Sequence, residues 1–386
     1  MKRLAAWIGL AAVAAIPARA DQAADAAAIQ PIIADARGLA APGCAVGVFR
    51  DGQESYVVAG SADLRSKRAI DPDTLFYAAS ISKQFTMLAV AQLVLAGKLS
   101  MDDDVRKWLP ELNYVDRPIT VAMLAYHTAG IPNINVLTAA AGFANVADAK
   151  RDDARKVISR ERRTRFAPGS RFDYSNGGYF LLSEIVSRAS GEKFAAYVDR
   201  AILEPMGMTR TVVMDDARIP DPVRALGYTQ TGGGFAERDN YPLYGGAGGM
   251  MISVREFAKY HYDITTGHKV WTPEIARFMT SPGLYADGLE IVRPGIGARY
   301  AAGLQVGADW VYHSGTQLGF GNMFAVLPGK KLAIAMLCNR GEVKPLARMD
   351  AIVRANGGGK LPPISSRLPP PSNDPRYTTP PDPLVD

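Results

Sequence analysis

The sequence predicts an α+β fold, in which an antiparallel sheet flanked by helices is built from both ends of the chain and a mostly helical domain is inserted between its halves. Three observations lead to this expectation. Apolar, strand-like runs separated by tight turns occur around residues 44–59 and again at 303–338. The intervening chain, from about 116 to 211, follows a helical pattern. A segment that is apolar on nearly every side, 81–96, predicts a helix buried in a large core.

The elements can be placed in order. Two strands that flank a turn at Asp51-Gly52 open the sheet, and the buried helix stops at Gly97. The further segments are helices at 179–189 and 194–203, strands at 303–306, 310–313, 322–327 and 332–338, and a last helix at 345–355.

The first twenty residues predict a secretory signal peptide. Lys2 and Arg3 precede an apolar run, 4–16, and a small-residue site ends at Ala20, after which we expect cleavage. The run is too short to cross roughly 30 Å of hydrocarbon, so no stable membrane span is expected once the signal is removed. The protein is therefore expected in the periplasm or outside the cell.

Four parts of the chain follow from this pattern. They are a signal peptide at 1–20, a discontinuous α/β domain at 21–115 and 295–360, a mostly helical inserted domain with active-site loops at 116–294, and a Pro-rich tail at 361–386.

Composition excludes several classes of protein. With 386 residues, 48% of them hydrophobic, the chain can bury a full core. Its formal charge of +6 falls to +3 when the signal peptide, with its three basic residues and no acid, is removed. The densest basic stretch, 150–165, also contains three acids, so a nucleic-acid partner is not expected. Oligomeric state is left open.

Only two cysteines are present, Cys44 and Cys338, each within an apolar run. In an oxidising compartment they could form a disulfide, but buried thiols are the favoured interpretation.

No metal or cofactor is expected from the motifs. The sequence contains no Gly-x-Ser-x-Gly elbow, no His-Glu-x-x-His pair, no phosphate loop and no dinucleotide fingerprint. The four histidines show no metal-ligand spacing.

Ser80 and Lys83, at the start of the buried helix, are the first candidate catalytic pair. A serine at this place is often only a helix cap. Positions three apart share a helix face, however, so Lys83 can reach the Ser80 hydroxyl. Burial and the positive end of the helix dipole both disfavour a charged lysine there, so a neutral Lys83 could act as a base. Free backbone N–H groups at the same turn could bind an oxyanion.

Two further motifs follow in order, Tyr174-Ser175-Asn176 and His313-Ser314-Gly315. With Ser80-x-x-Lys83 they resemble the three motifs of the class C β-lactamase and penicillin-binding-protein family, which also includes family VIII esterases and D-amino-acid amidases. The resemblance spans roughly residues 30–355 and implies the β-lactamase/DD-peptidase-like fold. Further segments similar to the family are 127–132, 168–179 and 248–253.

The resemblance implies a role for each motif residue. Ser80 is the nucleophile, Lys83 its base and Tyr174 a proton shuttle. Asn176 orients the acyl group. His313 and Ser314 lie on the strand that borders the substrate, and Gly315 and Thr316 bind substrate beside them. The backbone N–H groups of Ser80 and Thr316 form the oxyanion hole. His127 is interpreted as structural.

The third motif departs from the family because His313 stands where β-lactamases commonly carry lysine. Histidine is mostly uncharged near neutral pH, so recognition of a substrate carboxylate is in doubt. Protonation of His313 towards pH 6 is expected to restore part of this charge.

The sequence therefore predicts a serine hydrolase that forms an acyl-enzyme with a small-molecule ester, amide or peptide. A carboxylesterase is the first choice, with a D-amino-acid amidase or peptidase beside it. A DD-peptidase, a weak β-lactamase and a non-catalytic penicillin sensor remain as alternatives.

Overall fold

The computed structural model describes residues 17–112, 117–220, 223–293, 297–357 and 361. Most of the expected signal peptide and nearly all of the expected tail lie outside this part. The helices are α1 (Pro17–Ile33), α2 (Lys83–Leu95), α3 (Val121–Ala125), α4 (Ile134–Ala140), α5 (Arg151–Ser159), α6 (Asn176–Ser190), α7 (Phe194–Val198), α8 (Glu204–Met206), α9 (Val254–Tyr262), α10 (Pro273–Thr280) and α11 (Pro345–Ala355).

A seven-stranded antiparallel sheet forms the centre of the molecule, in the order β10-β11-β12-β13-β14-β1-β2. Its strands are β1 (Cys44–Arg50), β2 (Gln53–Ala59), β10 (Arg299–Tyr300), β11 (Gln305–Val306), β12 (Val311–Gln317), β13 (Phe320–Leu327) and β14 (Leu332–Cys338). Because β1 pairs with β14 along its whole length, the two ends of the chain meet in one sheet, which confirms the predicted α+β fold.

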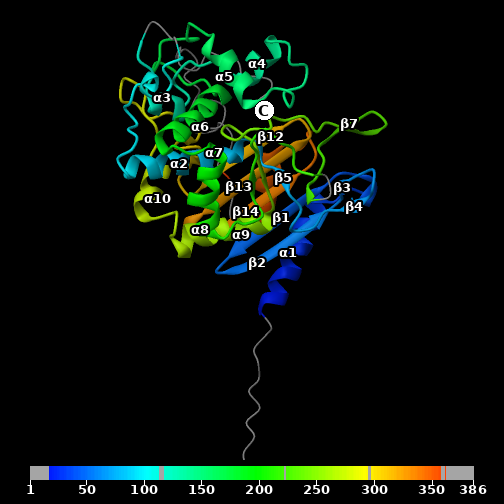
Figure 1. The fold of residues 1–386 in the computed structure, drawn as a ribbon. Helices are drawn as coiled ribbons and strands as arrows, with labels where there is room; N and C mark the ends of the chain where they lie inside the picture. The colour runs from blue at the N-terminus through cyan, green and yellow to red at the C-terminus, as the bar shows by residue number, and fades with distance from the viewer. Residues whose placement is uncertain (1–16, 113–116, 221–222, 294–296, 358–360, 362–386) are drawn as a thin grey trace, which may run out of the picture.

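Helices cover both faces of this sheet, because side chains along a strand point alternately to opposite faces. On β1, Val46 and Val48 pack in a cluster with residues of α1 and α11. Ala45 and Phe49 face the other way, into the larger core that contains α2 and α9. In Figure 1, α1 lies below β1 and β2, while α3 to α6 gather at the opposite end of the molecule.

The inserted region is mostly helical but also contains short strands. β9 (Met250–Ile252) pairs with β5 (Phe76–Tyr77) and with β6 (Val212–Val213) in a three-stranded sheet. β7 (Tyr228–Thr231) and β8 (Gly234–Glu237) form a hairpin that projects from the body in Figure 1. A last small sheet pairs β3 (Ser61–Asp63) with β4 (Arg68–Ala69).

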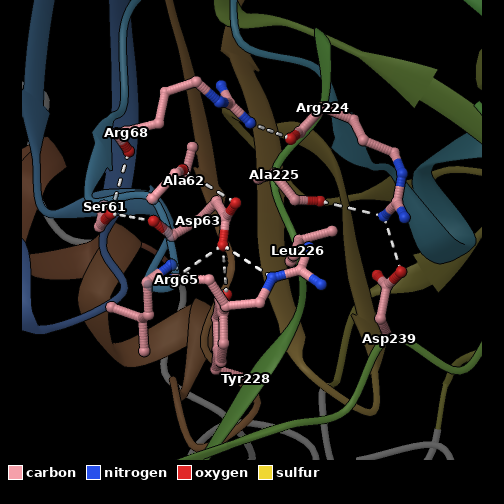
Figure 2. A network of polar contacts seen from close by, with 12 residues as sticks. Ser61, Ala62, Asp63, Arg65, Arg68, Arg224, Ala225, Leu226, Tyr228 and Asp239 are labelled. Atoms are coloured by element: carbon pink, nitrogen blue, oxygen red, sulfur yellow. Dashed lines mark hydrogen bonds and ion pairs between the residues drawn. The ribbon is translucent and has the colours of Figure 1, made fainter. Parts of the chain in front are cut away.

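A network of polar contacts fixes the base of the β7–β8 hairpin (Figure 2). Arg68 donates to the carbonyl of Arg224, and the buried Arg224 guanidinium lies 2.7 Å from Asp239. Arg224 also donates to the Tyr241 hydroxyl at 3.0 Å. Arg224 precedes β7 and Asp239 follows β8, so the network joins both ends of the hairpin and holds them against the β3–β4 sheet. Asp239 lies just before the segment 241–249, so the network also fixes where that segment begins.

The expectation of two free thiols is wrong. Cys44 and Cys338 are directly opposite each other in the β1–β14 register, and they form a disulfide. The two residues lie 294 positions apart in sequence, so the register that brings them together could not be read from either strand alone.

Several predicted elements begin earlier or end later in the structure. The last helix has the expected bounds. β12 extends four residues beyond the expected strand end at 313, and α6 begins at Asn176 because Ser175 caps it by accepting the Gly177 N–H. No helix in the described part of the chain is both long and apolar enough to span a membrane.

Candidate active site

Ser80 lies on a tight helical turn, Ala79–Ser82, that leads directly into α2. The residue before it, Ala79, has a φ of +50°, in the left-handed region that non-glycine residues rarely adopt. Such strain persists where surrounding structure enforces it, and it is common at functional sites. Here the strained residue lies in the turn that follows β5, and Ser80, next to it, lines a pocket.

Lys83 is fully buried, and its Nζ has three polar neighbours. It lies 3.0 Å from Ser80 Oγ, 2.8 Å from Asn176 Oδ1 and 2.8 Å from the carbonyl oxygen of Ala247. Burial, and secondarily the charge of Arg293, holds the pKa of Lys83 well below its usual range. A neutral amine has two N–H donors and one lone pair. If the two N–H bonds point to Asn176 and Ala247, which can only accept there, the lone pair faces Ser80, and the Ser80 hydroxyl donates to it.

Tyr174 lies over the same pair. The Lys83 Nζ is 4.8 Å from the centre of its ring. Burial raises the pKa of Tyr174 to about 12, while the positive charge of Arg293 and the Ser80 hydroxyl act in the opposite direction. The phenol is therefore protonated near neutral pH. Its hydroxyl is buried and is near enough to Ser80 to be affected by it, but it falls short of a full hydrogen bond with any described residue.

His127 holds the Tyr174 segment on both sides. Its carbonyl accepts the Asp173 N–H at 2.8 Å, and its Nδ1 accepts the Ser175 N–H at 3.1 Å. The ring packs on Tyr174 with 4.2 Å between ring centres. Since Nδ1 is an acceptor, the neutral ring carries its proton on Nε2, which donates to the Tyr300 hydroxyl at 3.0 Å. Burial lowers the pKa of His127 well below its usual range, so the ring stays neutral.

The third motif approaches Ser80 from β12. A Cβ on Gly315 would lie 2.2 Å from the Ala78 carbonyl oxygen, so only glycine allows this strand so close to the Ser80 turn. Thr316 lines the same pocket as Ser80, whereas Ser314 is partly buried outside it. Both residues of the expected oxyanion hole, Ser80 and Thr316, thus line one pocket.

His313 is buried behind the pocket and does not line it. Its Nδ1 faces the Ser314 carbonyl oxygen at 2.5 Å. Burial, with Lys83 and Arg293 nearby, lowers the pKa of His313 to about 3. The ring is therefore uncharged near neutral pH, as expected, but the expectation that pH 6 would protonate it is wrong.

Arg293 was not anticipated from the sequence. Its guanidinium carbon lies 5.0 Å from the centre of the Tyr174 ring, on a turn where its N–H donates to the Ala298 carbonyl at 2.9 Å. It is only 9% exposed. An isolated arginine after a valine in a Pro-Gly loop carries no sequence signal, because only the tertiary fold brings position 293 to position 174.

The pocket in front of Ser80 combines polar and apolar walls. It is lined by Tyr77, Ala79, Ser80, Ile134, Asn135, Tyr174, Asn176, Pro242, Tyr244, Ala247, Gly248, Thr316 and Gln317. No group of three or more metal-ligating side chains occurs within the residues that the structure describes.

A serine hydroxyl beside a buried amine and a phenol is an arrangement typical of hydrolases with a serine nucleophile. Comparison with known proteins agrees with this class. The model of the Beta-lactamase family matches residues 29–358, so the chain belongs to the Beta-lactamase family.

Curated relatives and solved structures extend the comparison. The chain is 26% identical over 336 residues to the D-aminopeptidase of Gluconobacter oxydans, covering 85% of this chain and 61% of that protein. It is 31% identical over 169 residues to penicillin-binding protein 4* of Bacillus subtilis, covering 44% and 37%. The octameric penicillin-binding protein homologue from Pyrococcus abyssi matches with a TM-score of 0.69 at 27% identity, over 82% of this chain and 74% of that one.

The D-amino acid amidase from Ochrobactrum anthropi SV3 matches with a TM-score of 0.72 at 20% identity, over 87% of this chain and 99% of that one, a likeness of fold alone. The chain spans about three fifths or less of the length of the first curated relatives.

Proposed function

We propose that this protein is an exported serine hydrolase that cleaves carboxylic esters or amides through an acyl-enzyme on Ser80. One observation carries the proposal: the fully buried Lys83 amine lies 3.0 Å from Ser80 Oγ, with two other acceptors to hold its N–H bonds. A structural lysine would have a carboxylate partner, and none of the three neighbours is one.

The reaction follows from these contacts. Lys83 takes the Ser80 proton as Oγ attacks the substrate carbonyl carbon, and backbone N–H groups of Ser80 and Thr316 stabilise the oxyanion. The protonated Lys83, through the Tyr174 hydroxyl, returns that proton to the departing alcohol or amine. Water then attacks the acyl carbon. Its proton passes through Tyr174 and Lys83 to Ser80 Oγ as the acyl bond breaks, which releases the acid and free Ser80.

Substrate class is supported by the relatives. They include a D-aminopeptidase, which favours D-amino-acid amides and peptides beside simple esters. A DD-peptidase or a weak β-lactamase would use the same acyl-enzyme. A penicillin sensor would acylate Ser80 and fail to release it.

A turnover panel tests the proposal. It contains p-nitrophenyl esters of increasing acyl length, D-amino-acid amides, a D-Ala-D-Ala peptide and a chromogenic cephalosporin, assayed with wild type and Ser80→Ala. We expect multiple turnovers on an ester or an amide that Ser80→Ala loses. A single-turnover burst with every substrate would support the sensor instead, and turnover that survives Ser80→Ala would reject Ser80 as nucleophile.

Export is supported by the N-terminal sequence and by the Cys44–Cys338 disulfide, because disulfides persist in oxidising compartments. Cell fractionation with N-terminal sequencing tests it. We expect the mature chain outside the cytoplasm and beginning at Asp21, and a cytoplasmic chain that keeps Met1 would contradict it.

A further inference from the structure

Arg293 is a buried cation beside the site for which no acid partner is found. Within the described residues no ion pair involves it, and its Nη1 is buried without a hydrogen-bond partner. Arg165 differs in this respect, because it pairs with Asp173 at 2.8 Å, which also neutralises the acid next to Tyr174. A buried charge without a partner is costly to fold around, so its retention calls for an explanation from function.

The charged and titratable groups that face Arg293 are all cationic or neutral. Lys83 approaches from α2 and His313 from β12, while His127, Tyr174, Tyr300 and Tyr312 complete the surroundings. The positive charge of Arg293 acts to lower the pKa of each of these groups, although burial raises the pKa of the tyrosines overall.

The pocket wall adds no negative charge. None of the side chains that line it is an aspartate or a glutamate. A substrate that carries an ammonium group near its scissile bond would meet a fixed positive field with no carboxylate to pair with. A neutral or anionic group would meet no such penalty.

We propose that Arg293 makes the site select substrates by charge, so that neutral and anionic acyl groups are accepted and cationic ones are rejected. Arg293 thus supplies the fixed charge that is absent at position 313. This inference rests on the proposed function and narrows it: N-acylated amides and acidic esters are favoured over compounds with a free ammonium group. The D-aminopeptidase named among the relatives would differ from this chain in that respect.

Three p-nitrophenyl esters of similar acyl size test the inference. The acyl groups are 4-(trimethylammonio)butyrate, 5,5-dimethylhexanoate and glutarate, which carry a fixed positive charge, no charge and a negative charge. With wild type we expect kcat/KM for the cationic ester to be about ten- to a hundredfold below that of the neutral ester, the size of one unscreened charge contact at intermediate dielectric. We expect the anionic ester to equal or exceed the neutral one.

Substitutions at position 293 test whether Arg293 causes the difference in kcat/KM between the neutral and the cationic ester. Arg293→Met should reduce the neutral-to-cationic ratio at least fivefold. Arg293→Gln provides a second neutral variant if the methionine variant folds poorly. Arg299→Met is the matched control: Arg299 lies in the same segment and its removal changes the net charge equally, but it is 43% exposed and weakly paired with Glu290, so the ratio should stay at the wild-type value.

Each outcome decides the inference. A cationic ester that is hydrolysed as well as the neutral one, or a ratio that Arg293→Met and Arg293→Gln leave unchanged, would overturn it while leaving the proposed function intact. Failure of wild type to hydrolyse any ester, together with failure of a fluorophosphonate to label Ser80, would overturn both.

Discussion

Lys83 shows how one side chain can link catalysis to stability. Near neutral pH the folded protein holds a neutral amine, because burial lowers the pKa of Lys83, whereas the unfolded chain holds an ammonium group with a pKa near about 10.4. The unfolded state therefore binds one more proton. As pH rises from the folded to the unfolded pKa, this difference stabilises the fold by up to about 1.4 kcal/mol per pH unit.

We therefore expect the free energy of unfolding to rise less steeply with pH in Lys83→Met than in wild type. Urea denaturation at pH 7, 8 and 9 measures both slopes, and the difference between the two proteins isolates the lysine from other titrating groups. Equal slopes would mean that Lys83 is charged in the folded protein and cannot be the base.

Tyr174 is predicted to move a proton while remaining largely protonated between reactions. Its pKa of about 12 makes it a donor near neutral pH, and removing the hydroxyl leaves the ring packing on His127 in place. Tyr174→Phe should thus keep the melting temperature within a few degrees and lower kcat by roughly 10²- to 10⁴-fold. If the folded variant is fully active, the tyrosine is only a packing residue.

The Ser80–Lys83 pair was accessible from sequence because helical spacing alone brings the two side chains together. Arg293 was not, since its contact with Tyr174 depends on how a distant turn folds. The sequence therefore predicts which groups react but does not reveal the positive charge beside them.

The segment that carries Tyr174 and Asn176 depends on His127. Because His127 itself has a φ of +58°, its replacement must satisfy both the backbone conformation and the Ser175 N–H. Asparagine tolerates this conformation and offers an acceptor, whereas leucine does neither. We expect His127→Leu to lower kcat by at least tenfold with a smaller change in KM, and His127→Asn to recover part of the loss.

Active-site titration with a fluorophosphonate corrects each variant for its folded fraction. Tyr300→Phe serves as a control that removes the hydroxyl facing His127 Nε2, which also interacts with Tyr179, and it should have the smallest effect. Wild-type kcat per labelled site in both His127 variants would show that the histidine stabilises the fold without positioning Tyr174.

Helix ends were predictable where glycines mark them, as at Gly97 and Gly191, both of which adopt positive φ after a helix. The continuation of β12 to Gln317 was not. Ser314 to Gln317 are polar or small, and they form a strand because β13 pairs with them residue by residue.

At the scale of the whole molecule, the disulfide joins the two ends of the chain within the sheet. Both cysteines pack in the cluster with α1 and α11, on the face away from α2 and the pocket. Replacing both by alanine should therefore lower stability by about 2–4 kcal/mol and leave activity at 25 °C nearly unchanged. Thermal unfolding of oxidised wild type, reduced wild type and the double variant measures this, and three equal melting temperatures would show that the bond does not form.

The general architecture was the most predictable level. Strand patterns at both ends and helices between them sufficed to expect a single sheet from two distant segments. No local sequence pattern shows which face of the sheet each helix covers. The pairing of β9 with β5 and β6 near Ser80 likewise depends on tertiary packing.

The whole proposed reaction depends on Ser80 as the nucleophile that Lys83 activates. Intact-mass analysis after treatment with a fluorophosphonate, followed by peptide mapping, tests this role. We expect a single adduct on Ser80 in wild type and no adduct in Ser80→Ala. An adduct on Ser82, Ser175 or Ser314, or labelling that survives in Ser80→Ala, would contradict it.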